Sequence, residues 1–129
     1  LLSNYSPDMR KVVDAYNTDP APDTYYLFLV KNPKAGKLAG YMPRSKEFGF
    51  IFTDQAGSEQ AIIHTMAHEL GHGAFNLRHT FAEEKYTIPQ GSTDNLMDYT
   101  QAFGTKLYKH QWDQMRYPEI VVGLFEKDE

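Results

Sequence analysis

The sequence predicts a small α+β domain, built from a short twisted sheet, one long histidine-rich helix and a helix near the C-terminus. Three apolar and aromatic runs in the first half have the length of strands, and two later segments show helical spacing of apolar residues. With 129 residues, 41% of them hydrophobic and 14% aromatic, the chain can bury one core. We therefore expect residues 1–129 to form a single domain.

Charge and cysteine content narrow the range of partners and sites. The 13 basic residues are scattered and outnumbered by 17 acidic ones, so we expect no nucleic-acid partner. No apolar run approaches transmembrane length, which predicts no membrane insertion. Because the chain has no cysteine, any metal must be held by histidine and carboxylate side chains, a ligand set that suits zinc.

The first residues lack a methionine and lack the charged and apolar regions of a signal peptide. We therefore expect a mature form or a domain taken from a larger polypeptide, and its localisation stays open. The first helix is expected at Ser6-Pro7, with Ser6 as N-cap and Pro7 at the first helical position. Its apolar face would carry Met9, Val12, Val13 and Tyr16. The prolines between Asn17 and Asp23 must break it.

Three strands are expected next. Tyr25–Val30 is a continuous apolar and aromatic run, which predicts a strand buried on both faces at the centre of the sheet. Leu38–Met42 is a weaker second strand, and Phe48–Phe52 is the third. Because the third strand directly precedes the histidine-rich helix, we expect it at the sheet edge beside a cleft, where it could pair with an extended peptide.

The histidine-rich helix holds the most informative residues. Gly57-Ser58 supplies its cap, and an apolar face of Ile62, Ile63, Met66, Ala67 and Leu70 is expected to pack against the core. His68 and His72 are four residues apart, about 400° around the axis, so both imidazoles point the same way and can hold one metal ion. Glu69 lies about 100° from His68, close enough to reach a water at that ion without becoming a ligand. The alternative is a polar helix face whose histidines are merely hydrogen-bonded.

Other histidines and acidic residues of the chain could complete a metal site with this pair. A catalytic zinc site normally uses three protein ligands, so a third must come from downstream, where His79, Glu83 and Glu84 are the candidates. His64 has no glutamate after it and is expected to support the ligands or lie on the surface. His110 is expected to be an ordinary residue of the last helix.

The C-terminal half is expected to contain a loop, a turn and a closing helix. Residues Glu83 to Asp94 are polar and include Pro89-Gln90-Gly91-Ser92, which indicates a surface loop. Lys106 to Met115 carries apolar residues near helical spacing and ends before Pro118, so we expect a helix there, packed through Leu107, Tyr108, Trp112 and Met115. The tail from Glu119 is expected to fray.

Two motifs together resemble the metzincin family of zinc metallopeptidases. His68-Glu69-Leu70-Gly71-His72 is followed by Asn76-Leu77-Arg78-His79 where the family has G-x-x-H, with one extra residue before the turn. Asn95-Leu96-Met97-Asp98-Tyr99, sixteen residues after His79, looks like the family's methionine turn. The sequence around these two motifs is also similar to metallopeptidase domains of exported or toxin-like Bacteroidetes proteins. This similarity favours an exported protein.

This resemblance implies a zincin-like fold and one catalytic zinc ion held by His68, His72 and His79. It further implies that Met97 lies beneath the metal and that Tyr99 approaches it. For His79 to reach the ion, the helix must end near Gly73 or Ala74 and the chain must reverse at Asn76 with positive φ, because a continuing helix would carry His79 about 10 Å along the axis.

The function expected from these residues is a zinc-dependent endopeptidase acting on a protein or peptide substrate. Glu69 would be the general base, and Tyr99 would hydrogen-bond the developing oxyanion. Two alternatives remain open, a catalytically silent zinc-binding interaction module and a zinc hydrolase of a non-peptide substrate. The presence of Glu69 argues against the silent module, because a structural zinc site has no use for that carboxylate.

Overall fold

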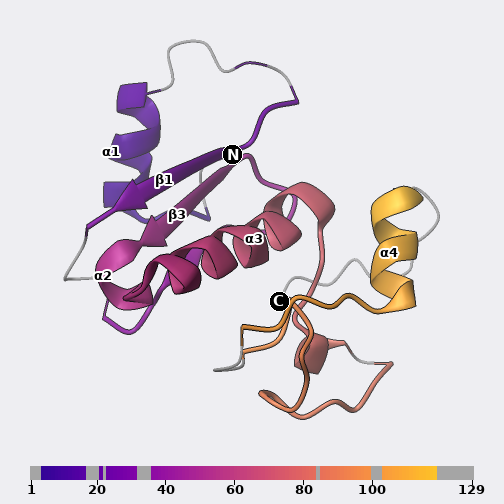
Figure 1. The fold of residues 1–129 in the computed structure, drawn as a ribbon. Helices are drawn as coiled ribbons and strands as arrows, with labels where there is room; N and C mark the ends of the chain where they lie inside the picture. The colour runs from indigo at the N-terminus through magenta and orange to yellow at the C-terminus, as the bar shows by residue number, and fades with distance from the viewer. Residues whose placement is uncertain are drawn as a thin grey trace.

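A computed structural model describes residues 4–16, 21, 23–31, 36–83, 85–99 and 103–118. These residues form a small α+β domain, as the sequence predicts. Helices α1 (Pro7–Tyr16) and α3 (Glu59–Phe75) lie on opposite sides of a three-stranded mixed sheet (Figure 1). A short helix α2 (Thr53–Ala56) precedes α3, and the loops that follow α3 lead to helix α4 (Lys109–Arg116).

The sheet contains all three predicted strands, the first two with shorter bounds and the third with the predicted ones. They are β1 (Tyr26–Val30), β2 (Gly40–Tyr41) and β3 (Phe48–Phe52), in the spatial order β1-β3-β2. β1 pairs with β3 in parallel, whereas β2 pairs with β3 antiparallel. The parallel pair agrees with the long connection between β1 and β3, since parallel strands cannot be joined by a tight hairpin.

The placement of two strands is opposite to our expectation. β3 is the central strand, not the edge beside a cleft, and all five of its residues are buried. β1 lies at an edge instead of the centre, and Leu29 in it is 54% exposed. The strand order follows from long-range pairing, because β1 and β2 both pair with β3. Helix α3 packs mainly against β3 and β2, so part of β1 stays uncovered. Of the two edge strands, β2 is the one that packs against α3 and lies beside Glu69.

Alternation along β3 divides its side chains between the two helices. Phe48, Phe50 and Phe52 join Tyr5 and Val13 in one buried cluster between the sheet and α1. On the other face, a Cβ atom added at Gly49 would lie 2.7 Å from Leu27 Cδ2 and 2.9 Å from Met42 Sδ, so only glycine fits there. The strand is thus covered on both faces, which explains its continuous apolar sequence.

Tyr5 ties the segment before α1 to the central strand. Its side chain is 4% exposed, and its hydroxyl donates a 2.6 Å hydrogen bond to the carbonyl oxygen of Phe48. Burial raises the pKa of Tyr5 from 10.0 to about 12. The neutral phenol is therefore favoured by folding, and this stabilisation is complete below pH 10 and is lost as the pH rises from 10 through 12.

Tyr5→Phe is expected to lower the free energy of unfolding at neutral pH by about 1 kcal/mol, through loss of one buried hydrogen bond. The variant should also lose less stability than the parent between pH 8 and 11, because the group whose ionisation opposes folding is gone. Urea unfolding of the metal-free protein at both pH values measures this difference. Tyr25→Phe, at a tyrosine that is 44% exposed, is the matched control. If Tyr5→Phe and the parent lost the same unfolding free energy between pH 8 and pH 11, the raised pKa would not belong to Tyr5.

The first and third helices begin as the sequence predicts. The side chain of Ser6 accepts a hydrogen bond from the amide of Met9 at 3.2 Å, and that of Ser58 accepts one from Ala61 at 3.1 Å. The buried face of α3 differs from our expectation. Its buried residues are Ala61, His68, Glu69, Gly71, His72 and Gly73, whereas Ile63 on the predicted core face is 59% exposed. The polar motif, not the apolar stripe, faces the interior.

Helix α4 starts three residues later than predicted and packs through different side chains. Gln111 and Gln114 are its buried residues, and Trp112 is 47% exposed. Gln114 Nε2 donates to the carbonyl oxygen of Asn76 at 2.7 Å, so amide hydrogen bonds attach this helix to the end of α3. The predicted tail from Glu119, and most of the break between Asn17 and Asp23, lie outside the described residues.

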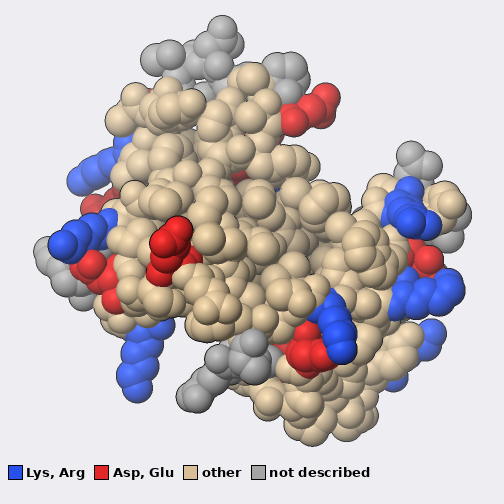
Figure 2. Space-filling model, viewed as in Figure 1, with Lys and Arg blue, Asp and Glu red and all other residues tan. Residues whose placement is uncertain are grey.

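The surface carries charges of both signs. In the view of Figure 2, acidic and basic side chains lie mostly around the rim of the face, and much of the surface over α3 carries neither. Among the described residues, no helix combines the length and apolarity needed to cross a membrane.

Candidate metal centre

Three histidines meet at the C-terminal half of α3. The Nε2 atoms of His68 and His79 are 3.3 Å apart, and those of His72 and His79 are 3.1 Å apart. One nitrogen from each residue lies within 4.8 Å of the others, a grouping that could hold a metal ion. His68 and His72 come from successive turns of α3, and His79 comes from the chain that follows it. Of the candidates for a third ligand, the described residues thus select His79.

The end of α3 brings His79 into this cluster. The helix ends at Phe75, one or two residues later than expected, and Asn76 adopts the left-handed conformation with φ 56°. The amide of Asn76 donates to the carbonyl oxygen of His72 at 3.0 Å, and that of Leu77 donates to Gly71 at 2.9 Å. These bonds close the helix and reverse the chain. The predicted turn at Asn76 is confirmed.

Two backbone carbonyls fix the orientation of the helical histidines. His68 Nδ1 is 2.8 Å from the carbonyl oxygen of Leu96, and His72 Nδ1 is 2.7 Å from that of Leu77. A carbonyl oxygen can only accept, so each Nδ1 carries the proton and donates it. Each Nε2 is then left with a lone pair that points into the cluster, which is the arrangement a metal ligand needs.

Burial keeps the cluster in the form that binds cations. Desolvation, together with the neighbouring histidines, lowers the pKa of His68 to about 4 and that of His79 to about 3. Desolvation also lowers the pKa of His72. The three imidazoles are therefore neutral at pH 7, and the Nε2 lone pairs of His68 and His72 face the cluster. Neutral imidazoles at this spacing are ligands that a cation can bind.

The spacing of the nitrogens fits zinc. Tetrahedral bonds of 2.0–2.1 Å place two ligand nitrogens about 3.3 Å apart. The measured separations of 3.1 and 3.3 Å are close to that value. An all-imidazole set also suits copper, nickel and iron, so the donors indicate a borderline transition metal and leave its identity open. The site is compatible with the zincin type.

Met97 forms the floor under the helical histidines. Its side chain is 0% exposed, and a Cβ atom added at Gly71 would lie 2.5 Å from Met97 Sδ. Gly71 stands between His68 and His72, so only a residue without a side chain allows the methionine to approach this turn of the helix. The structure thus places Met97 against the turn of α3 that carries the two ligands, and its position beneath a bound metal stays a prediction.

The turn that carries Met97 is held by buried amides. Asn95 Oδ1 accepts a hydrogen bond from the amide of Met97 at 2.9 Å, and Asn95 Nδ2 donates to Gln111 Oε1 at 2.8 Å. Gln111 Nε2 donates back to Asn95 Oδ1 at 3.2 Å. Helix α4 thus supports the metal centre through this amide pair, a role that sequence reasoning missed.

Asp98 organises the loop on the other side of Met97. Its carboxylate accepts hydrogen bonds from the amides of Gly91 at 2.7 Å, Thr93 at 3.0 Å and Tyr99 at 2.8 Å, and from the Thr93 hydroxyl at 2.8 Å. Burial alone would raise the pKa of Asp98, but these four hydrogen bonds outweigh it and lower the pKa below 3.8. Sequence reasoning also missed this residue, although an aspartate in a turn next to Met97 was a local signal for it.

Asp98→Asn is expected to destabilise the metal-free protein by about 2 kcal/mol, because an amide nitrogen cannot accept and leaves partly buried donors unpaired. The lowered pKa means that the carboxylate stabilises the fold above pH 4 and that this contribution is lost as the pH falls through the folded-state pKa. Denaturant unfolding at pH 7 and pH 3.5 measures both effects. The difference in unfolding free energy between parent and variant should shrink at the lower pH. A difference that stays constant would show that the charged Asp98 carboxylate does not stabilise the fold.

Glu69 is buried beside the ligands, with 7% of its surface exposed. It lies against β2, because a Cβ atom added at Gly40 would be 2.9 Å from both Glu69 Cγ and Glu69 Oε1. Glu69 does not belong to the metal-binding group of described residues. It stands where a carboxylate can act on a molecule bound at the metal centre.

Tyr99 completes the rim of the site. Its ring centroid is 4.5 Å from that of His79 and 5.5 Å from that of His68, and the residue is 52% exposed. It lines both cavities that open beside the metal centre. Tyr99 thus lies next to two of the three histidines, and its contact with a metal or substrate stays a prediction.

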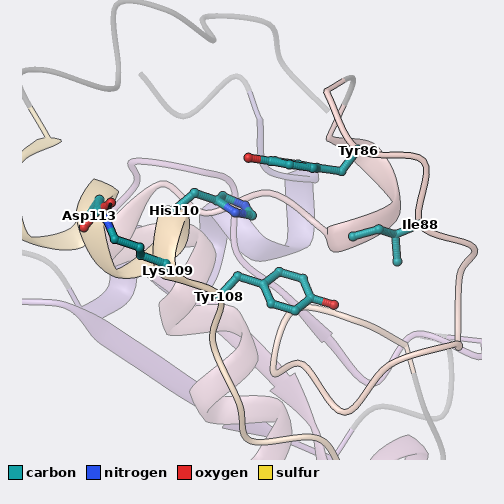
Figure 3. Close-up of a pocket in the computed structure, with 6 residues that line it drawn as sticks. All are labelled: Tyr86, Ile88, Tyr108, Lys109, His110 and Asp113. Carbon is teal, nitrogen blue, oxygen red and sulfur yellow. Dashed lines mark hydrogen bonds and ion pairs between the residues drawn. The ribbon is translucent and has the colours of Figure 1, made fainter.

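The remaining candidates lie outside the ligand set. His64 Nε2 is 2.9 Å from the carbonyl oxygen of Gly104, so His64 lines the cleft without belonging to the group. Glu83 is likewise not part of it, and Glu84 lies outside the described residues. His110 is in α4, where it stacks on Tyr86 with centroids 4.8 Å apart beside a separate cavity of about 390 Å³ (Figure 3).

The geometry of the centre is the evidence for its chemistry. It consists of three neutral imidazoles, a methionine floor, a buried carboxylate and an exposed tyrosine. Comparison of the chain with protein-family models, with curated proteins and with solved structures gives no significant match in any of the three. The conclusion that the described residues support is a three-histidine site that could bind a metal ion.

Proposed function

We propose that this protein is a zinc-dependent endopeptidase of the metzincin type. The observation that carries the proposal is the buried Glu69 carboxylate between the three histidines and the edge strand β2. A site that only stabilises a fold has no use for such a group. The order of the ligands along the chain, the turn at Asn76 and the Met97 floor support the same assignment.

Each polar group has a role in this reaction. Zinc at the three nitrogens would supply Lewis-acid activation of water and of the scissile carbonyl. Glu69 accepts the proton of the attacking water and passes it to the leaving amine. Tyr99, which lines the same cavities as Glu69, donates a hydrogen bond to the charge that develops on the carbonyl oxygen. The carbonyls of Leu96 and Leu77 hold the helical imidazoles in the required tautomer.

The edge of β2 would bind the peptide. Phe52 donates to the carbonyl oxygen of Ala39 at 2.8 Å, and Gly40 is registered with Ile51. Since antiparallel pairs alternate, Gly40 belongs to the pair without hydrogen bonds to β3, and its N–H and C=O point to the outer edge. An extended peptide can add there as a further strand, next to Glu69.

The test is metal analysis combined with digestion of a random peptide library. Protein loaded with one equivalent of Zn²⁺ is expected to cleave internal peptide bonds, and protein treated with a chelator should not. Restored cleavage after zinc is added back would show that the loss comes from the metal. If the loaded protein binds zinc tightly but cleaves no peptide, the endopeptidase proposal fails and a non-peptide substrate or a binding role must be sought.

A further inference from the structure

We infer that the cleft selects peptides with an acidic side chain on the N-terminal side of the bond to be cleaved, and that Arg44 is the selecting residue. The inference rests on the proposed function, because it concerns the substrate of the same site. Three observations carry it: the division of the cleft, the direction of β2 and the distribution of charge.

The cleft has two arms that meet at the metal centre. One arm, of about 620 Å³, is lined by Leu38, His64 and Phe103, among others. The second arm, of about 320 Å³, is lined by Met42 and Arg44, among others. Leu38, Gly40, Glu69 and Tyr99 line both arms, so the reacting groups stand at the junction. A bound peptide would extend into one arm on each side of the scissile bond.

The direction of β2 assigns an end of the peptide to each arm. The chain of β2 runs from the arm lined by Lys37 and Ala39 towards the Arg44 arm, past Gly40 at the junction. Antiparallel pairs are somewhat more stable per residue than parallel ones, so a peptide added to this edge should run the opposite way. Its N-terminal side then lies in the Arg44 arm, and its C-terminal side lies in the arm that contains Phe103.

The positive charge of Arg44 gives the N-terminal arm its preference for acidic side chains. Arg44 is the sole lysine or arginine among the described residues that line this arm, and it is half-buried. A guanidinium presents a planar fork of donors that matches a carboxylate, so a glutamate or aspartate side chain fits here better than a neutral or basic one.

Three other charged residues among those described line the cleft. Glu69 stands at the junction and lines both arms equally, so it does not discriminate between them. Asp98 lines only the other arm, and its carboxylate is occupied by four hydrogen bonds. Lys37 lines the other arm as well and is exposed, so solvent screens its charge more strongly than that of Arg44.

The test uses one peptide library in two assays. Zinc-loaded parent protein digests a random octapeptide library, and sequencing of the products locates each cleaved bond. Zinc-loaded Glu69→Gln protein captures peptides from the same library, so that selection is also read from binding alone. We expect Glu and Asp to be enriched over Gln by about 3- to 10-fold within about three residues before the bond.

Variants at Arg44 decide whether this residue is responsible. Arg44→Gln should abolish the acidic preference in both assays, Arg44→Glu should replace it with a preference for Lys and Arg, and Arg44→Lys should keep part of it. Lys37→Glu should leave the N-terminal preference unchanged. Arg116→Glu, an exposed charge reversal in α4, is the control for net charge. Zinc content and thermal unfolding identify any variant that fails to fold, and Arg44→Lys then carries the comparison.

The outcomes separate this inference from the proposed function. Three outcomes would overturn the inference and leave the endopeptidase proposal intact. They are cleavage without an acidic preference, an acidic preference after the cleaved bond, and an acidic preference that persists in Arg44→Glu. If no peptide is cleaved, the proposed function fails. In that case, equal capture of acidic and basic peptides by zinc-loaded Glu69→Gln would reject Arg44 as a selecting residue too.

Discussion

His79→Ala is expected to weaken zinc binding by more than about 100-fold, because loss of a direct ligand should exceed the 10- to 100-fold cost of losing a group that only supports one. His79 supplies the Nε2 atom that lies within 3.3 Å of both other ligand nitrogens. Without it, two imidazoles from one helix must hold the ion alone. Competition with a chromogenic chelator at pH 7 measures the affinity.

Two controls make this result specific. Glu83→Ala should bind zinc as tightly as the parent, because Glu83 lies outside the ligand group. Asn76→Gly should also bind zinc, since glycine adopts the left-handed conformation found at this position without strain. Circular dichroism of the metal-free proteins shows whether each variant is folded. A His79→Ala protein that binds zinc like the parent would remove this residue from the site.

Glu69→Gln is expected to reduce peptide cleavage by at least about 100-fold while zinc stays bound, since general acid–base groups contribute about 10²- to 10⁴-fold. Glutamine has nearly the same shape and keeps the packing against Gly40, but it cannot accept the proton. Rates on the best library peptide, together with zinc content by atomic absorption, give both quantities from one preparation.

Glu59→Gln is the matched control, because Glu59 is an exposed residue in the first turn of the same helix. It should change neither cleavage nor zinc content. If Glu69→Gln loses its zinc, the carboxylate is a ligand and the proposed roles must be redrawn. If it keeps both zinc and activity, another group is the base, and Glu69 would be only a packing residue beside β2.

The residues that sequence reasoning missed share one property. Asn95, Gln111 and Asp98 act through buried hydrogen bonds to partners that the loop and α4 bring together. Amides and carboxylates in polar segments look like solvated side chains, so their burial could not be read from composition. Gly40 did leave a signal, because a glycine within a strand often marks close approach of another group. Here that group is Glu69.

The sequence by itself determined the local chemistry of the centre. The four-residue spacing places His68 and His72 on one side of a helix, and Ser58 and Asn76 mark the ends between which that helix can form. The choice of His79 as the third ligand came from the resemblance to the metzincin signature, which requires a chain reversal such as the left-handed turn at Asn76. These inferences concern neighbours within about 20 residues, where helix geometry decides the outcome.

Only the tertiary structure decided which strand borders the cleft and which face of α3 is buried. β3 became central because β1 and β2 both pair with it, and β2 was left with the free edge beside Glu69. Strand order depends on contacts between distant segments, and an apolar run reads the same in either position. The motif face of α3 is buried because β2, Met97 and the Leu96 carbonyl cover it, and this cover satisfies the polar groups that burial would otherwise penalise.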